Sequence, residues 1–130
     1  MKNYLLLLLL LGISIAFTNC SDDEDEDLTI ELVGEYIGGY GSIPFGEINP
    51  YEIVVSKIDN KKVSVKPKSG NEFEETNFDL ERSNSSTIIS PPVSQQQLEK
   101  SVVFSLSTPT TITFSIDLTG DAHAFTGQKQ

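Results

Sequence analysis

Residues 111–118 read TITFSIDL, and this stretch decides the fold class. Every even-numbered position is apolar and every odd-numbered position is polar. Because successive side chains of a β-strand point to opposite faces, this alternation predicts a strand with one buried face and one solvated face. Residues 101–107 repeat the pattern, with Val102, Phe104 and Leu106 on the apolar positions. The two stretches together predict an antiparallel hairpin.

Two short connections set the register that we expect for the last three strands. A three-residue loop at 108–110 and a two-residue turn at Gly120 and Asp121 would bring apolar residues together across each pair. Phe104, Phe114 and Phe125 then share the buried side, which predicts a mainly filled interior. The expected partners are Leu106–Ile112, Phe104–Phe114, Val102–Ile116, Ile116–Phe125 and Leu118–His123, with Gly127 beside Phe114.

An earlier hairpin is predicted from residues 51–58 and 62–66 around the loop 59–61. A three-residue loop is weakly favoured over a two-residue one because it also pairs opposite charges. In that register the facing residues are Val55 and Val65 inside, with Ser56 and Ser64, and Glu52 and Lys68, outside.

Three further strands complete the pattern. Residues 73–80 and 86–90 are predicted to be strands joined through the short polar side chains of 83–85. The first strand, 32–40, contains Gly34, Gly38 and Gly39, and glycines inside a strand indicate a sharp bend or a close backbone approach. We therefore predict an all-β domain, either a small antiparallel up-and-down β-barrel or a two-sheet β-sandwich.

The opening and closing strands also resemble a known family. Residues 34–38 (GEYIG) and 125–129 (FTGQK) look like the first and last strands of small lipocalin-like, calycin-type surface lipoproteins of the Bacteroidota. The resemblance covers residues 32–129 as a strand pattern. It implies the barrel alternative and a place on a cell envelope.

The first residues are typical of a secretory signal peptide. Lys2 precedes a largely apolar block at 5–17, which is shorter than the roughly 20 residues that a membrane-spanning helix needs. We assign residues 1–19 to the signal peptide. A buried N-terminal helix is disfavoured because the block is leucine-rich on every face.

The single cysteine, Cys20, follows this block directly, and residues 17–20 (FTNC) resemble a bacterial lipobox. A lone cysteine in a secreted domain cannot form an internal disulfide. The resemblance implies that Cys20 becomes the lipidated first residue of the mature chain, which predicts attachment to the membrane through a lipid anchor.

Six consecutive acids at 22–27 follow, and they repel one another and offer no apolar surface to bury. We expect residues 20–31 to form an acidic tether and residues 32–130 to form the barrel. The start of the tether resembles the export signal of surface-displayed lipoproteins, which implies an outer-membrane protein facing the cell exterior. A plain linker on the periplasmic face is the alternative. The residues of this signal are Ser21, Asp22, Asp23 and Glu24.

Composition and motifs exclude several classes of function. The chain has a net charge of −10 and no basic stripe, which argues against nucleic acid as a partner. His123 is the only histidine, so a site with several histidines is excluded, and we expect neither a metal nor a cofactor. A Ser-His-Asp arrangement with Asp117 or Asp121 is disfavoured because no nucleophile-elbow motif is present.

The sequence therefore favours a non-enzymatic, surface-anchored binding module whose ligand, a small apolar molecule or a protein, is unknown. An accessory subunit that docks on another outer-membrane protein without a ligand of its own is the alternative. A small hydrolase is the third hypothesis. An apolar cavity of roughly a few hundred Å³ would favour ligand binding, and a filled interior with an exposed apolar patch would favour docking.

Overall fold

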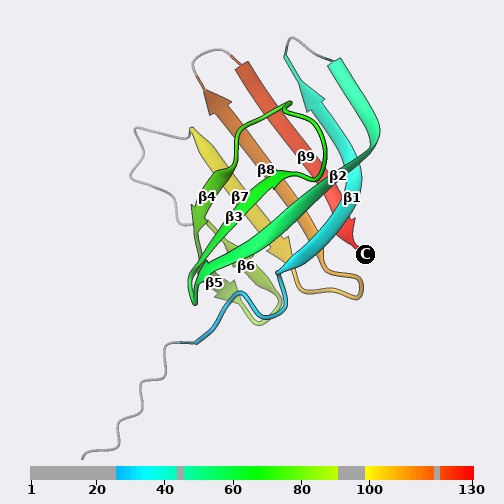
Figure 1. The fold of residues 1–130 in the computed structure, drawn as a ribbon. Helices are drawn as coiled ribbons and strands as arrows, with labels where there is room; N and C mark the ends of the chain where they lie inside the picture. The colour runs from blue at the N-terminus through cyan, green and yellow to red at the C-terminus, as the bar shows by residue number, and fades with distance from the viewer. Residues whose placement is uncertain (1–25, 44–45, 91–98, 119–120) are drawn as a thin grey trace, which may run out of the picture.

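The computed structural model describes residues 26–43, 46–90, 99–118 and 121–130, and these segments fold as strands and loops (Figure 1). Within these ranges there is no helix long and apolar enough to cross a membrane. The strands are β1 (Gly34–Ser42), β2 (Gly46–Asp59), β3 (Lys62–Pro67), β4 (Thr76–Asp79), β5 (Glu81–Asn84), β6 (Thr87–Ile89), β7 (Lys100–Ser105), β8 (Thr111–Leu118) and β9 (Asp121–Lys129).

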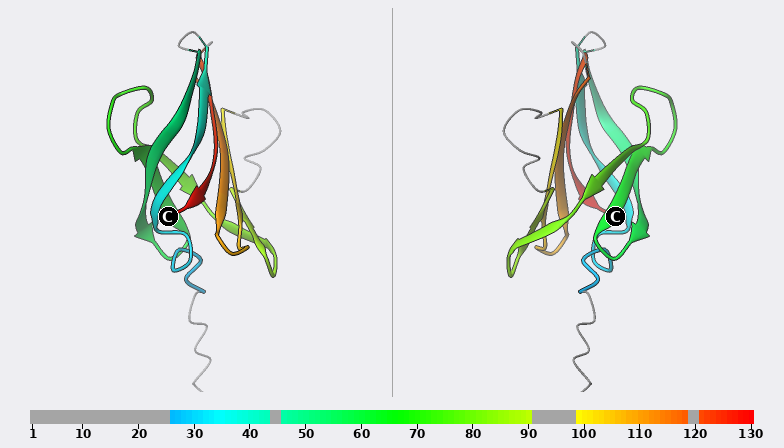
Figure 2. Two further views of the ribbon diagram at one scale, coloured as in Figure 1. Left: turned by 90° about the vertical axis from the view of Figure 1, so that its right-hand side faces the viewer. Right: turned by 90° about the vertical axis from the view of Figure 1, so that its left-hand side faces the viewer.

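The strands form one antiparallel sheet in the order β4-β3-β2-β1-β9-β8-β7-β6-β5. The strands at the two ends of this order, β4 and β5, are separated in the chain by Leu80 alone. The sheet therefore curls until its ends meet, and Figures 1 and 2 show a nearly closed, flattened barrel. The predicted all-β, calycin-like barrel is confirmed, and the sandwich alternative is not formed.

The last three strands have the predicted faces, but the predicted register is wrong by two residues. Phe114 lies opposite Val102 on β7 and opposite Phe125 on β9. Because side chains alternate with a period of two, a shift of two residues leaves every apolar residue on the buried face. In place of the expected partners, the register pairs Phe104 with Ile112, Ile116 with His123, Leu118 with Asp121 and Ile112 with Gly127.

The β7–β8 connection explains the first shift. β7 ends at Ser105, and the amide of Leu106 donates to the carbonyl of Ser86 (2.8 Å) instead of continuing the ladder with β8. The connection is therefore the five residues 106–110 rather than three. A contact with a distant turn, and not the shortest possible loop, determines this register.

The β8–β9 connection is shifted in the same way. Asp121 pairs with Leu118 and is the first residue of β9, whereas we expected it in the turn. The connection is consequently residues 119–120. This hairpin does have the predicted two-residue length.

The β2–β3 hairpin has the predicted register. Lys68 extends the pairing, because its amide donates to the carbonyl of Glu52 (3.0 Å) and its ammonium group lies 3.4 Å from the Glu52 carboxylate. The turn differs in one respect, since Asp59 pairs with Lys62 after a β-bulge. The predicted facing pairs that the structure contains are Val55–Val65 and Ser56–Ser64.

The predicted strand 73–80 is interrupted at its end, where buried Leu80 separates β4 from β5. The amide of Leu80 donates to the carbonyl of Lys61 (2.8 Å), outside the β3–β4 ladder. The predicted polar turn lies one residue later than expected. Asn84 Oδ1 accepts hydrogen bonds from the amide (2.9 Å) and the hydroxyl (3.0 Å) of Ser86.

The pairing of β1 with β9 closes the barrel and requires two glycines. A Cβ atom on Gly38 would lie 2.0 Å from the carbonyl oxygen of Thr126, and one on Gly127 would lie 2.5 Å from that of Ile37. Real Cβ atoms do not approach other atoms so closely. The close backbone approach predicted from the glycines of the first strand is therefore confirmed at Gly38.

The interior is filled by side chains. Phe114 has a stacked contact with Phe125 (ring centroids 5.6 Å apart) and tilted contacts with Phe73 (5.3 Å) and Phe78 (6.4 Å). Phe104 is fully buried on the same side of the sheet. Aromatic rings at these separations attract one another beyond simple burial. The predicted shared burial of the three phenylalanines of β7, β8 and β9 is confirmed.

Residues 28–31 were expected in the tether, but part of this segment belongs to the folded unit. Leu28, Thr29 and Leu32 are buried, and the Tyr36 hydroxyl donates to the carbonyl of Leu32 (2.7 Å). The segment turns back on itself, since the amide of Leu32 donates to the carbonyl of Thr29 (3.0 Å). It lies at the end of the barrel where β1 begins (Figure 1).

Replacing Phe114 with alanine tests this core. Phe114→Ala removes a ring that contacts three other phenylalanines, and we expect the free energy of unfolding to fall by about 3–5 kcal/mol. Val103→Ala is the control, because Val103 lies on the outer face of β7 and is 43% exposed. Urea titration of both variants would measure the difference. A loss below about 1 kcal/mol for Phe114→Ala would contradict the buried placement.

Candidate functional site

The predicted lipidation residue, Cys20, and the predicted export-signal residues Ser21, Asp22, Asp23 and Glu24 lie outside the described residues. Their roles remain predictions from the sequence. The structure does describe the last two acids of the run, Glu26 and Asp27, and it places both against the barrel.

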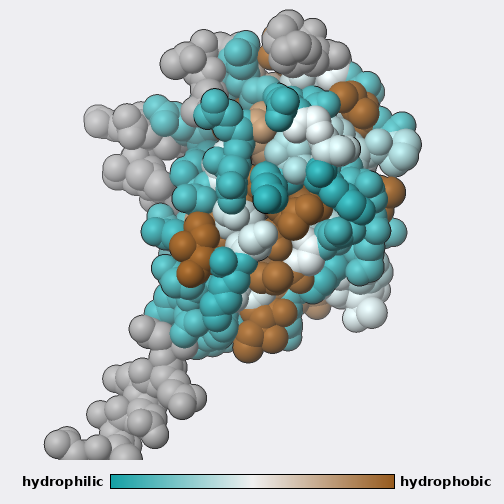
Figure 3. Space-filling model, in the orientation of Figure 1, coloured by the Kyte–Doolittle hydropathy of each residue, from teal (hydrophilic) through white to brown (hydrophobic). Residues whose placement is uncertain are grey.

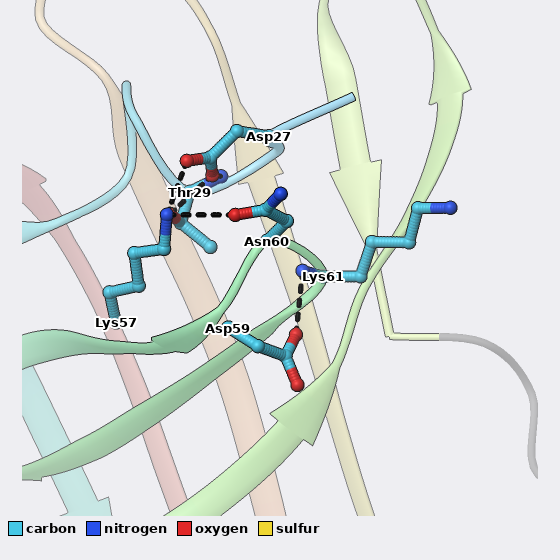
Figure 4. A network of polar contacts seen from close by, with 6 residues as sticks. All are labelled: Asp27, Thr29, Lys57, Asp59, Asn60 and Lys61. Carbon is cyan, nitrogen blue, oxygen red and sulfur yellow. Dashed lines mark hydrogen bonds and ion pairs between the residues drawn. The ribbon is translucent and has the colours of Figure 1, made fainter. Parts of the chain in front are cut away.

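Asp27 is the centre of a polar network that we name the N-terminal clasp, made with Thr29, Lys57 and Asn60 (Figure 4). Its Oδ1 accepts hydrogen bonds from the amide (2.9 Å) and the hydroxyl (2.6 Å) of Thr29, and its Oδ2 forms an ion pair with Lys57. The Lys57 ammonium group also donates to Asn60 Oδ1 (2.9 Å). The clasp joins the N-terminal segment to the tip of the β2–β3 hairpin.

Two contacts beside the clasp extend it. Glu26 Oε1 lies 2.6 Å from Nη2 of Arg82 on β5, and the amide of Leu28 donates to the carbonyl of Asn60 (2.8 Å). The sequence suggested a solvated tether here, because a run of acids is usually solvated. The sequence feature that could have indicated this contact is Leu28. An apolar residue directly after the acids can be buried, and its burial fixes their position against the barrel.

The electrostatics of the clasp favour the ionised carboxylate. The hydrogen bond from Lys57, and then those from Thr29, lower the pKa of Asp27 from 3.8 to about 2. The folded state therefore binds a proton at Asp27 less readily than the unfolded chain does. The stability that this carboxylate contributes is fully present above about pH 4 and is lost as the pH falls towards 2.

Asp27→Asn should remove this pH dependence. The variant keeps the shape of the side chain but loses the charge that pairs with Lys57, so we expect a lower melting temperature than the wild type at pH 6. The gap should shrink as the pH falls from about 4 to 2, where wild-type Asp27 becomes protonated. Thermal unfolding followed by circular dichroism would measure this. An equal gap at pH 6 and pH 2 would show that the ion pair contributes nothing.

A buried polar cluster lies inside the other end of the barrel. The Tyr40 hydroxyl donates to the carbonyl of Glu72 (3.3 Å) and lies 2.5 Å from Nδ1 of His123. The Tyr51 hydroxyl donates to Glu72 Oε2 (2.9 Å), and the rings of Tyr40 and Tyr51 are stacked with centroids 4.5 Å apart. Phe73 covers the cluster from the β3–β4 loop, 5.9 Å from the Tyr40 ring.

The surroundings of this cluster keep the hydroxyl groups of both tyrosines protonated. Burial raises the pKa of Tyr40 and of Tyr51 above the ordinary value of 10.0, and the neighbouring Glu72 raises both further. Neither hydroxyl ionises near neutral pH. Both therefore remain hydrogen-bond donors, and the cluster has the character of a satisfied core network.

His123 was expected opposite Leu118 at the barrel end, and it lies instead opposite Ile116 with its ring against Tyr40. It is buried, whereas Asp117 points outwards and is exposed. The side chains of Asp117 and His123 therefore lie on opposite faces of the sheet and do not meet. Among the described residues, no group of three or more His, Cys, Asp and Glu side chains could hold a metal ion.

Tyr40→Phe should destabilise the barrel without changing its shape. The substitution removes only the hydroxyl and leaves His123 Nδ1 buried without this partner, which costs about 1–3 kcal/mol. Urea titration would measure the loss. His123→Ala, tested alone and together with Tyr40→Phe, would show whether the two losses couple. Fully additive losses would contradict a direct bond between these residues.

A hollow of about 660 Å³ is lined mainly by outward-facing residues where β2, β1, β9 and β8 lie side by side. We name it the outer trough. One row across the strands is Glu47, Gly41, Ala124 and Ser115, and the row beyond it is Ile43, Ala122 and Asp117. The floor lies close to the backbone because its glycine, alanine and serine residues have short side chains. The carboxylates of Glu47 and Asp117 lie at the two sides.

The trough lies at the end of the barrel opposite the N-terminal clasp. β1 runs from Gly34, next to the clasp, to Ser42, and β8 ends and β9 begins at the same far end (Figure 1). At about 3.3 Å per residue, the nine residues of β1 span roughly 30 Å. The two ends of the molecule are therefore well separated.

Other parts of the described surface have smaller hollows and scattered exposed apolar residues. Two hollows of about 460 Å³ flank the β3–β4 loop, one beside Tyr51 and one beside Gly70. On the face over β2, β3 and β4, Figure 3 shows apolar side chains interspersed among polar ones. The large apolar residues that are exposed in the described chain are Ile30, Val33, Ile43, Ile58 and Val103.

Comparison with known proteins finds no protein-family model, no curated protein and no solved structure that matches this chain. Any assignment of function therefore rests on the residues and their arrangement.

Proposed function

We propose that this protein is a lipid-anchored, non-enzymatic binding module of the outer membrane, related to the small lipocalin-like surface lipoproteins of the Bacteroidota and facing the cell exterior. The observation that carries the proposal is the contrast between a filled barrel interior and the outer trough at the end remote from the N-terminal segment. The binding surface is the outside of the barrel.

The sequence before the barrel supports the anchor. Cys20 follows an apolar block of signal-peptide length, and the acids at 22–27 separate it from Leu28, the first buried residue of the described chain. The N-terminal clasp holds the end of this acidic run at one end of the barrel. A barrel attached at that end presents its opposite end, and with it the outer trough, away from the membrane.

The filled interior argues for a protein partner over a small apolar ligand. Tyr36, Tyr40, Phe78, Phe104, Phe114 and Phe125 are all fully buried in the space where a larger calycin-type barrel would hold its ligand. The trough instead has an open shape and exposed Ile43 at its edge (67% exposed). An exposed aliphatic side chain beside a hollow suits contact with another protein.

An accessory subunit that docks on another outer-membrane protein is the second candidate. An accessory subunit would use the same surface. The two functions differ in whether the partner is a soluble protein or a protein of the outer membrane. The identity of a cross-linked partner separates these two functions.

Photo-cross-linking in the producing cells tests the proposal. A photo-reactive phenylalanine analogue in place of Ile43, at the exposed edge of the trough, should give a discrete adduct with another protein. The same analogue in place of Val103, also exposed on the outer face, should give none. Mass spectrometry of the membrane-extracted chain should find an acylated Cys20 as its first residue.

Cys20→Ala should release the chain from the membrane and abolish the adduct if the partner is met at the cell surface. Equal adducts at positions 43 and 103 would contradict a specific binding surface. An intact Met1 on the membrane-extracted protein would contradict the anchor.

A further inference from the structure

We infer that the outer trough recognises a basic segment of a partner protein, in which a lysine or arginine lays its aliphatic stem on the trough floor and pairs with a carboxylate at the side. This inference rests on the proposed function and names the chemistry of its partner. Four observations lead to it, and they concern charge, shape, spacing and the other possible occupants.

The charge of the trough is one-sided. Glu47 and Asp117 line it, and none of the described residues lining it is a lysine or arginine. Neither carboxylate forms an ion pair with any residue in the described ranges. Lys100, at the nearby start of β7, donates to the carbonyl of Asn77 and lies over the Phe78 ring, so it does not neutralise them.

The shape of the trough suits a long, thin side chain. Gly41, Ala124 and Ser115 project little above the sheet and form one row across β1, β9 and β8, and Ala122 lies in the next row. The stems of lysine and arginine bury well on such apolar surfaces while the charged head stays in water. A bulkier floor would leave no room for the stem.

The spacing of the carboxylates sets what can reach them. Glu47 lies on β2 and Asp117 on β8, three interstrand spacings apart and two residues apart along the strands, which is about 16 Å at 4.8 Å per spacing and 3.3 Å per residue. One side chain cannot bridge that span. A segment that crosses the strands can place one basic residue at each side, so the site fits a segment with two basic residues better than an isolated cation.

Charge disfavours the other occupants. A second copy of this chain carries a net charge of −10, and its acidic run at 22–27 would be repelled by both carboxylates. Phosphate groups of lipids or nucleic acids would be repelled in the same way. A basic protein segment gains both the charge attraction and the apolar floor.

Amide NMR of the full chain in detergent micelles, titrated with acetylated tetralysine amide, tests the inference. We expect shifts at Gly41, Ala122 and Ala124, and tetraglutamine at the same concentration should leave these amides unmoved. Glu47→Gln and Asp117→Asn should each weaken binding at the trough about two- to fivefold, the range for one exposed ion pair. Ala124→Trp should abolish it by filling the floor.

Glu75→Gln is the matched control, because Glu75 is an exposed carboxylate on the β3–β4 loop. The affinity of this variant for tetralysine at the trough should equal that of the wild type. Shifts confined to the acidic run at 22–27, or no shift at the trough, would overturn the inference. Equal shifts with tetraglutamine would overturn the charge selection while leaving a binding surface in place. The cross-linking at Ile43 separately decides whether the proposed function stands.

Discussion

The antiparallel pairing of β1 with β9 is the constraint on which the rest of this structure depends. It joins the first strand to the last, so a meander of short hairpins becomes a nearly closed barrel. Gly38 and Gly127 allow the two backbones to approach, and larger residues there would force them apart. Closure also encloses the core, since β9, which pairs with β1, carries buried Phe125, and the next strand, β8, carries buried Phe114.

The filled interior separates this barrel from one that holds a ligand. Aromatic rings occupy the centre, and even the polar groups inside, such as Tyr40 and His123, bond to one another. A buried network of this kind is stable only when its members are satisfied, so it resists opening into a cavity. A partner can therefore bind only on the outer surface of the barrel. There, small residues on neighbouring strands form a hollow without changing the packing of the core.

The two ends of the barrel differ in chemistry, and this difference gives the molecule a direction. One end carries the N-terminal clasp, in which Lys57 and Arg82 hold the last acids of the run. The other end carries the outer trough, where Glu47 and Asp117 have no cation from the described chain beside them. A protein with these two ends can be held by one and can present the other.

The sequence by itself determined the fold class, the buried face of each strand in the last two hairpins and the β2–β3 register, because each depends on local alternation and one short turn. It also predicted the close approach at Gly38. The tertiary structure alone decided the two-residue shifts of the β7–β8 and β8–β9 registers, and the first arises because the Leu106 amide bonds to Ser86 rather than to β8. It likewise decided that Asp27 binds Lys57 and that Glu47 and Asp117 flank one trough, because residues 30 and 70 positions apart meet only when the barrel closes.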